Sequence, residues 1–127
     1  MKQIYLEIIG KVISKKNLWK PSRYGGIYPD RKINEFVDSA YIQIKQQLKS
    51  WQPIEAPVAI DVCFMADDRN DLDGMLTSIL DLLENVKIIK NDRQVRRVNA
   101  RREKVKAKDA KTFINIVDLA DIENEKG

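Results

Sequence analysis

The chain has 127 residues, of which 43% are hydrophobic and 33% charged, and its formal net charge is +4. This length fits one domain with a single modest core. The sequence contains one cysteine and no histidine. It therefore excludes an internal disulfide, a cysteine-based zinc site, histidine metal ligands and a Ser-His triad, and it leaves carboxylates and lysines for chemistry.

No run of apolar residues approaches the roughly 20 residues of a membrane span. Residues 1–10 alternate like a strand and lack the long apolar core and the small-residue cleavage site of a signal peptide. We therefore expect a cytoplasmic protein with no membrane partner.

Basic residues form two blocks on either side of an acidic centre. Residues 11–32 hold seven Lys or Arg against one acid, and residues 87–111 hold eleven against three. Residues 33–86 hold ten acids against three bases. One solvated basic face is ordinary. Two basic blocks around a carboxylate-rich centre favour a polyanionic partner, with nucleic acid as the first candidate.

In chain order, the first expected elements are a strand over residues 2–9, a loop over residues 14–30 and a helix over residues 31–49. Aromatic residues alternate with Lys and Arg in the loop, a composition suited to base stacking and phosphate contact. Packing of Trp19 and Tyr28 onto the core explains the aromatic residues equally well. The helix is indicated by apolar residues that recur at helical spacing.

After a connection with two prolines, residues 57–65 alternate as a strand. The apolar residues of this strand share one face, which we expect to be buried: Val58, Ile60, Val62 and Phe64. Cys63 belongs to the other face, and we expect it to be a buried structural thiol rather than a reactive one.

A second helix begins at Leu72, a basic strand spans residues 95–106, and a final strand spans residues 112–117. The order strand, helix, strand, helix, strand, strand predicts an α/β (α+β) fold in which a small mixed sheet packs with two main helices. Residues 1–119 would form this single domain. Residues 120–127 would form an acidic tail that we expect to be disordered.

Two aspartates, Asp71 and Asp73, stand where the chain passes from a polar turn into the second helix. Residues two apart point in nearly opposite directions on a helix but to the same side of an extended segment. The pair can therefore share a metal ion only if Asp71 precedes the helix, as a helical period beginning at Leu72 indicates. Helix capping is the ordinary alternative for the pair. Asp92, in the turn after the helix, is expected to return to the same end of the sheet.

From the first aspartate the chain reads Asp71-Leu72-Asp73-Gly74-Met75-Leu76-Thr77, and after the helix it reads Asn91-Asp92-Arg93-Gln94-Val95. This pattern resembles the RusA family of Holliday-junction resolvases, whose hallmark is Asp-x-Asp-Asn-x-x-Lys, a helix, and then Asp-Asp-x-Gln-Val. Gly10 and the Tyr-Pro-Asp-Arg-Lys step from Tyr28 to Lys32 are similar to phage-type members more loosely. The similarity spans roughly residues 4–117.

The resemblance implies an Mg²⁺-dependent endodeoxyribonuclease, able to use Mn²⁺ instead, that resolves four-way junctions in recombination and repair by paired symmetric cuts. Asp71, Asp73 and Asp92 would be its metal ligands and catalytic residues. A four-way junction is close to two-fold symmetric, so we expect a homodimer, as in the family. The resemblance also suggests a bacterial or phage-encoded protein that associates with the nucleoid.

Three positions depart from the family pattern, at Gly74, Thr77 and Asn91. Thr77 stands where the family has its lysine, and threonine supplies no positive charge to a transition state. Lys90, Arg69 and Arg102, in that order, are the candidate replacement cations, and Lys90 is therefore counted with the catalytic residues. Alternatively, the chain is a slow or inactive protein that still binds junctions or other nucleic acid.

The cations expected to contact DNA come from both basic blocks and from the turn before the second helix: Lys15, Lys16, Lys20, Arg23, Arg69, Arg93, Arg96, Arg97, Arg101, Arg102 and Lys104. On a strand, Arg97 and Arg101 would share one face, while Arg96 and Arg102 would share the other. Both faces cannot meet the same phosphate, so some of these cations must be solvated or lie at a subunit contact.

Overall fold

The computed structural model describes residues 3–14, 19–21, 27–29, 31–67 and 71–120. Its elements are β1 (Gln3–Ile9), β2 (Trp19–Pro21), β3 (Ile27–Pro29), α1 (Arg31–Leu48), β4 (Val58–Ala66), α2 (Leu72–Asn85), the 3-10 turn η2 (Asp92–Gln94), β5 (Val95–Lys104), the 3-10 turn η3 (Ala107–Asp109) and β6 (Lys111–Asp118). The expected strands and helices are confirmed at the expected places. The expected acidic tail beyond Ala120 lies outside the described residues.

Four strands form one mixed sheet in the order β1-β6-β4-β5. The strands β1, β6 and β4 pair antiparallel, whereas β4 and β5 pair in parallel. Helix α2 connects β4 to β5, so these three elements form a parallel crossover unit. The α+β fold with a small mixed sheet and two main helices is therefore confirmed.

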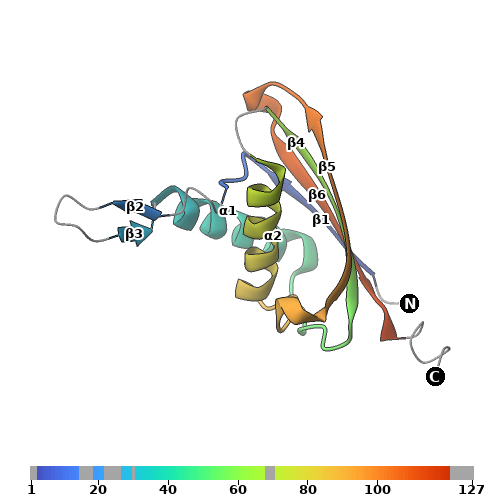
Figure 1. Ribbon diagram of the computed structural model, residues 1–127. Helices are drawn as coiled ribbons and strands as arrows, with labels where there is room; N and C mark the ends of the chain where they lie inside the picture. The colour runs from blue at the N-terminus through green and yellow to red at the C-terminus, as the bar shows by residue number, and fades with distance from the viewer. Residues whose placement is uncertain (1–2, 15–18, 22–26, 30, 68–70, 121–127) are drawn as a thin grey trace.

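Both helices cover the same face of the sheet, α1 over β1 and α2 over β5, and the opposite face is open (Figure 1). The alternation along β4 explains this arrangement. Its even-numbered residues from Val58 to Phe64 are almost fully buried against the helices, as expected. Isoleucines and leucines of α2 and β6 complete the same core.

The odd-numbered residues of β4 point to the open face. Cys63 is among them and is only half-buried, so the expectation of a buried thiol is wrong. The reason is that neither α1 nor α2 covers this face of the sheet, and a residue that alternates away from the core stays near solvent.

The segment expected to be a loop contains two short strands, because β2 and β3 pair with each other in a separate two-stranded sheet. This hairpin lies beside the start of α1 and projects away from the main sheet (Figure 1). Lys20 belongs to β2, whereas Lys15, Lys16, Arg23 and Arg69 lie outside the described residues. In the described part of the chain, no helix is long and apolar enough to cross a membrane.

Side chains of α1 occupy the outer edge of β1. The Gln43 amide accepts a hydrogen bond from the Ile9 N–H (2.7 Å) and donates one to the Ile9 carbonyl (3.0 Å). The Gln47 amide does the same for Glu7, at 2.8 and 2.7 Å. These two glutamines imitate a neighbouring strand and satisfy backbone groups that an edge strand would otherwise present to another chain.

Candidate active site

The first two candidate aspartates lie at the end of β4, where α2 begins. Asp71 has extended dihedrals (φ −68°, ψ 142°), and α2 starts at the next residue. The expectation that Asp71 precedes the helix proper is therefore confirmed. Asp73 follows in the first turn of α2, and both side chains are exposed.

The hydrogen bonds support the capping alternative at Asp73 but not at Asp71. Asp71 occupies the N-cap position, but its side chain makes no capping hydrogen bond to α2. The Asp73 carboxylate accepts a hydrogen bond from the adjacent Gly74 N–H at 2.9 Å. Its negative charge also suits the positive end of the helix dipole. The Asp71 carboxylate is thus not committed to capping the helix.

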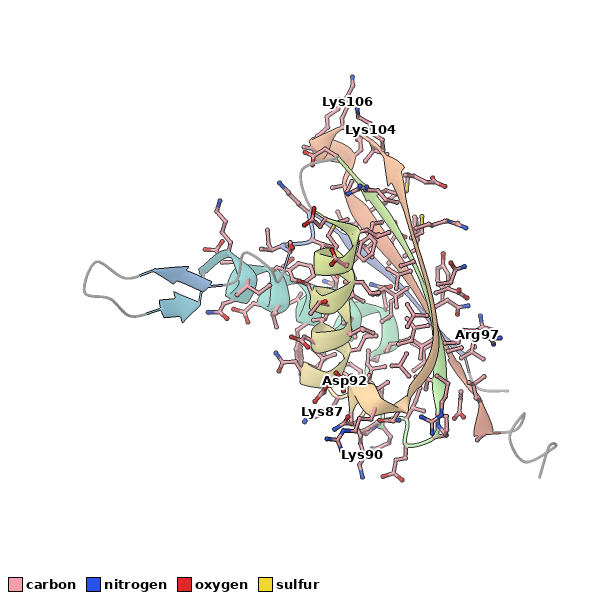
Figure 2. All side chains as sticks on the ribbon, in the orientation of Figure 1. Lys87, Lys90, Asp92, Arg97, Lys104 and Lys106 are labelled. Atoms are coloured by element: carbon pink, nitrogen blue, oxygen red, sulfur yellow. The ribbon has the colours of Figure 1, made fainter. Side chains whose placement is uncertain are left out.

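The third candidate, Asp92, lies at the opposite end of the sheet, so the expectation that it returns to the end holding Asp71 is wrong. The physical reason is the parallel pairing of β4 and β5. Between two parallel strands the chain must cross from the end of the first strand back to the opposite end of the sheet, where the second strand begins, and α2 forms that crossover. Figure 2 shows Asp92 beside Lys87 and Lys90 at one end, with Lys104 and Lys106 at the other.

The separation is large compared with any metal–ligand distance. The 14 residues of α2 lie between Asp71 and Asp92, and a helix of that length spans about 21 Å. Accordingly, among the described residues no group of three or more His, Cys, Asp or Glu side chains is close enough to hold a metal ion. One chain therefore holds Asp71 and Asp73 at one end of the sheet and Asp92 at the other.

The residues beside Asp92 in the motif build the turn that carries it. The Asn91 side chain accepts a hydrogen bond from the Arg93 N–H (2.8 Å) and caps η2 as part of a capping box. Asparagine and aspartate are equally good caps. The departure from the family pattern at Asn91 therefore preserves this local structure.

Gln94, the other member of that capping box, anchors the whole turn. Its side-chain oxygen accepts hydrogen bonds from the N–H groups of Lys90 (2.7 Å) and Asn91 (2.8 Å). Its amide nitrogen donates to the carbonyls of Ile54 (2.6 Å) and Ala56 (2.9 Å). Four hydrogen bonds from one half-buried side chain fix η2, and Asp92 with it, to the segment before β4.

We expect Gln94→Ala to lower the free energy of unfolding by about 2 kcal/mol, because partly buried backbone groups lose their partners. Urea denaturation measures this loss. Gln46→Ala is the matched control, since Gln46 is exposed on α1 and its loss should change stability by less than about 0.5 kcal/mol. Equal midpoints for the two variants would show that Gln94 does not anchor the turn.

The candidate catalytic cations are also divided between the two ends. Lys90 lies at the Asp92 end, where its ammonium group contacts the Glu55 carboxylate at 2.7 Å. A hydrogen bond from Lys90, and then its charge, lower the pKa of Glu55. Both side chains are largely exposed, so the pair adds little stability. Arg102 lies beside Phe64, toward the Asp71 end of the sheet.

The arginines of β5 divide between the two faces much as expected. Arg97 and Arg101 pair with Ala59 and Cys63 and belong to the open face, whereas Arg102 and Lys104 belong to the helix face. Arg96 is the extra residue at an irregularity in the pairing of β4 with β5, and its guanidinium donates to the Arg93 carbonyl at 3.1 Å.

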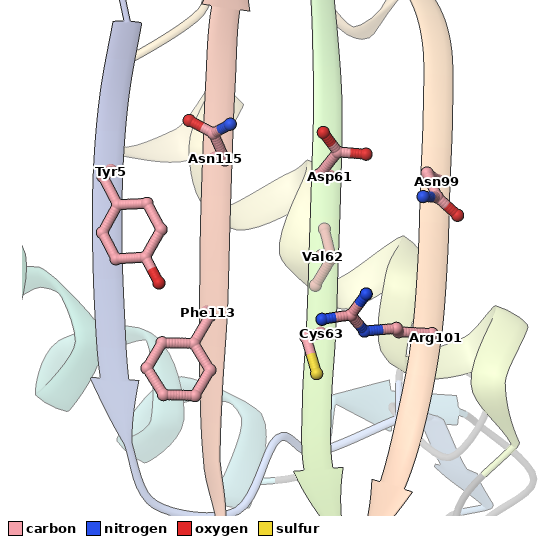
Figure 3. A pocket seen from close by; sticks show the side chains of 8 residues that line it. All are labelled: Tyr5, Asp61, Val62, Cys63, Asn99, Arg101, Phe113 and Asn115. Carbon is pink, nitrogen blue, oxygen red and sulfur yellow. The ribbon is translucent and has the colours of Figure 1, made fainter.

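The open face also carries a shallow hollow of about 300 Å³, lined by aromatic, amide and charged side chains: Tyr5, Asp61, Cys63, Asn99, Arg101, Phe113 and Asn115 (Figure 3). A hydrogen bond with Cys63, the charge that this thiol carries once it ionises, and the Glu103 carboxylate raise the pKa of Arg101, whose guanidinium is cationic at neutral pH in any case. None of the three candidate aspartates lines the hollow. It is therefore separate from the candidate active site.

A protein-family model and a curated relative indicate the same family for this chain. Residues 10–117 match the family model described as endodeoxyribonuclease RusA. A curated relative, the crossover junction endodeoxyribonuclease RusA of Aquifex aeolicus (strain VF5), is 24% identical over 94 residues, which cover 72% of this chain and 74% of that protein. By class, then, the protein is an endodeoxyribonuclease. The chain belongs to the RusA family, as the motif indicated.

Proposed function

We propose that this protein is a divalent-metal-dependent nuclease that resolves four-way DNA junctions by paired, symmetric cuts as a homodimer. The observation that carries the proposal is the family match over residues 10–117, which includes all three aspartates. The printed name of the Aquifex aeolicus relative supports a junction as the substrate. The eleven cations between residues 87 and 111 suit a phosphate-rich partner.

The residues at the start of α2 fit a divalent cation. Mg²⁺ and Mn²⁺ take oxygen ligands, and Mg²⁺ is commonly held by one or two carboxylates plus water and substrate phosphate. Asp71 and Asp73 offer two exposed carboxylates within three residues. Asp92 would be the third, and because one chain holds it at the opposite end of the sheet, it would reach the site as Asp92 of the partner subunit in the proposed homodimer. A bound divalent cation would supply Lewis-acid activation of the scissile phosphodiester.

The protein's own groups would place the DNA. The first turn of α2 presents backbone N–H groups and the positive end of the helix dipole, which favour a phosphate beside Asp71 and Asp73. The remaining cationic side chains on β5 and η2 would bind flanking phosphates. With no histidine in the chain, proton transfer must use carboxylates, lysines or water.

A cleavage assay tests the proposal. Synthetic four-way junctions and linear duplexes of the same arm sequence are incubated with Mg²⁺, with Mn²⁺ or with a chelator. We expect symmetric paired nicks on the junction in the presence of a metal and no cleavage with the chelator. Equal cutting of junction and duplex would contradict the proposed specificity.

A second candidate function is junction binding with little or no cleavage. The observation in its favour is Thr77, which replaces the family's lysine. Its hydroxyl donates a hydrogen bond to the Asp73 carbonyl at 2.9 Å and is therefore engaged with the backbone. Tight junction binding without nicks in either metal would establish this alternative.

We expect Thr77→Lys to increase the single-turnover nicking rate on a four-way junction by about tenfold or more, because an ammonium group beside Asp73 would stabilise charge on the transferred phosphate. Thr77→Met is the matched control, since it adds a chain of similar length without a charge. If the two variants nick at the same rate, a missing cation at this position does not limit the reaction.

A further inference from the structure

The open face of the main sheet carries side chains in regular rows. Because the strands pair in a fixed register, each row holds one residue from β1, β6, β4 and β5, in that order. One row contains Tyr5, Asn115, Asp61 and Asn99, and the next contains Glu7, Phe113, Cys63 and Arg101. All of them except Glu7 line the hollow of about 300 Å³ (Figure 3). The hollow is therefore built by the pairing of the sheet itself.

Two aromatic rings form the apolar part of the hollow. The ring centroids of Tyr5 and Phe113 lie 6.4 Å apart, and the ring planes are inclined by 33°, so the rings form one nearly continuous surface. The Lys111 ammonium group lies 5.3 Å from the centre of the Phe113 ring and 3.6 Å from the Glu7 carboxylate. Tyr5, in contrast, is 60% exposed. Its ring is accessible to a flat ligand that stacks on it.

The polar groups of the hollow suit the edge of a base better than a phosphate. Asp61 is an exposed carboxylate between the amides of Asn115 and Asn99. An ionised carboxylate only accepts hydrogen bonds, so it repels phosphate and binds N–H donors. The Asn115 oxygen accepts a hydrogen bond from the Gln3 amide at 2.7 Å, and its NH₂ group is directed toward Asp61 (Figure 3). This row offers an acceptor beside a donor, which matches the pattern on a base edge.

Only an unpaired base can use both the ring and this row. In duplex DNA the base-pairing edge is hydrogen-bonded to the complementary base, and the flat faces are covered by stacked neighbours. An unpaired base exposes that edge and a face for stacking on an aromatic side chain. A hollow of about 300 Å³ is at the small end of ligand sites, which suits a single base.

Two arginines lie on either side of the first row at the β5 edge. Arg97 pairs with Ala59 and Arg101 with Cys63, so both belong to the open face, and both are exposed. Four residues along a strand span about 13 Å. The two guanidinium groups are therefore placed to meet the backbone phosphates before and after a base bound in the hollow, as cations do in proteins that bind single strands.

We propose that the open face of the sheet binds an unpaired base of single-stranded DNA, with the Tyr5 ring stacked on the base and Asp61 accepting hydrogen bonds from its base-pairing edge. Arg97 and Arg101 hold the flanking phosphates. None of the three candidate aspartates lines this hollow, so the site goes beyond the proposed function and does not rest on it.

Fluorescence anisotropy without metal tests the site in the full chain. The ligands are a labelled single-stranded DNA of mixed sequence without self-complementarity and the linear duplex formed from it. We expect Tyr5→Leu to raise the dissociation constant for the single strand about tenfold, because the base loses its stacking partner. Tyr5→Phe is the matched control, since it keeps the ring, and it should stay within about twofold of wild type. Both variants should bind the duplex like wild type.

Asp61→Ala separates recognition of a base from simple attraction of charge. Loss of the carboxylate acceptor should weaken single-strand binding about fivefold and leave duplex binding unchanged. If the strand were held by its phosphates alone, removal of this negative charge would strengthen binding, and that result would overturn the proposal. Asp38→Ala makes the same change of charge at an exposed position on α1 and should leave single-strand binding unchanged.

Two further results would overturn the site: a wild type that does not bind the single strand, and equal affinities for Tyr5→Leu and Tyr5→Phe. Tighter binding of an RNA strand of the same sequence would overturn the assignment to DNA. None of these measurements depends on nicking, so their failure leaves the proposed activity intact. A protein that binds the single strand as expected but never nicks a junction would contradict the activity alone.

Discussion

Asp71→Asn is expected to abolish metal-dependent nicking of a four-way junction while the protein still binds the junction as tightly as wild type or more tightly. The rate should fall at least about a thousandfold, because metal-ion stabilisation of a transition state is worth several kcal/mol and each 1.36 kcal/mol is a factor of ten. Binding should persist because the substitution removes a negative charge beside phosphate and leaves the basic surface of β5 in place.

Single-turnover cleavage and fluorescence anisotropy without metal measure the two quantities separately. Asp38→Asn is the control, because Asp38 is also an exposed aspartate, on α1, and lies outside the candidate site. It should change neither quantity. Nicking by Asp71→Asn at the wild-type rate would remove this residue from the catalytic machinery. A parallel loss of binding and cleavage would instead indicate a structural defect.

Much of the fold follows directly from the sequence. The apolar residues of β4 recur with a strand period, and those of α1 and α2 recur with a helix period. Many of the same residues are buried in the structure, which is why the periods predicted these elements. The short strands β2 and β3 were not expected, because prolines and glycines in that segment obscure an alternating pattern. The half-buried position of Cys63 depends on a face left uncovered, and strand alternation shows which face is buried but not whether another element covers the second face.

The arrangement of the aspartates is a different matter. The local conformation of Asp71 could be predicted, because the helical period begins one residue later. The position of Asp92 depends on whether β5 runs parallel or antiparallel to β4, and a helix between two strands does favour a parallel crossover. That signal was present in the sequence. It would have placed Asp92 at the far end of the sheet.

Gln94 and Asn91 have structural roles in the candidate site. Both belong to the motif that indicated the family, yet their hydrogen bonds assign them to building the turn that carries Asp92. A motif therefore combines residues that perform chemistry with residues that position them. Side-chain hydrogen bonds to Ile54 and Ala56, some forty residues away, cannot be read from the sequence of the turn.

Subunit complementation tests the central claim, that one active site is built from two chains. Asp71→Asn and Asp92→Asn chains, each inactive alone, are mixed in equal amounts, unfolded and refolded together, and assayed on a four-way junction. In a mixed dimer, one site would combine intact Asp71 and Asp73 with the intact Asp92 of the partner subunit. Half of the dimers are mixed, so about a quarter of all sites would be intact.

We therefore predict that nicking returns to about a quarter of the wild-type level, and that the products carry single rather than paired nicks because each mixed dimer has one working site. A mixture of Asp71→Asn with Asp73→Asn should stay inactive, since both changes fall in the same half of the site. If the first mixture is as inactive as its two components, all three aspartates act within one chain, and the site built from two chains is wrong.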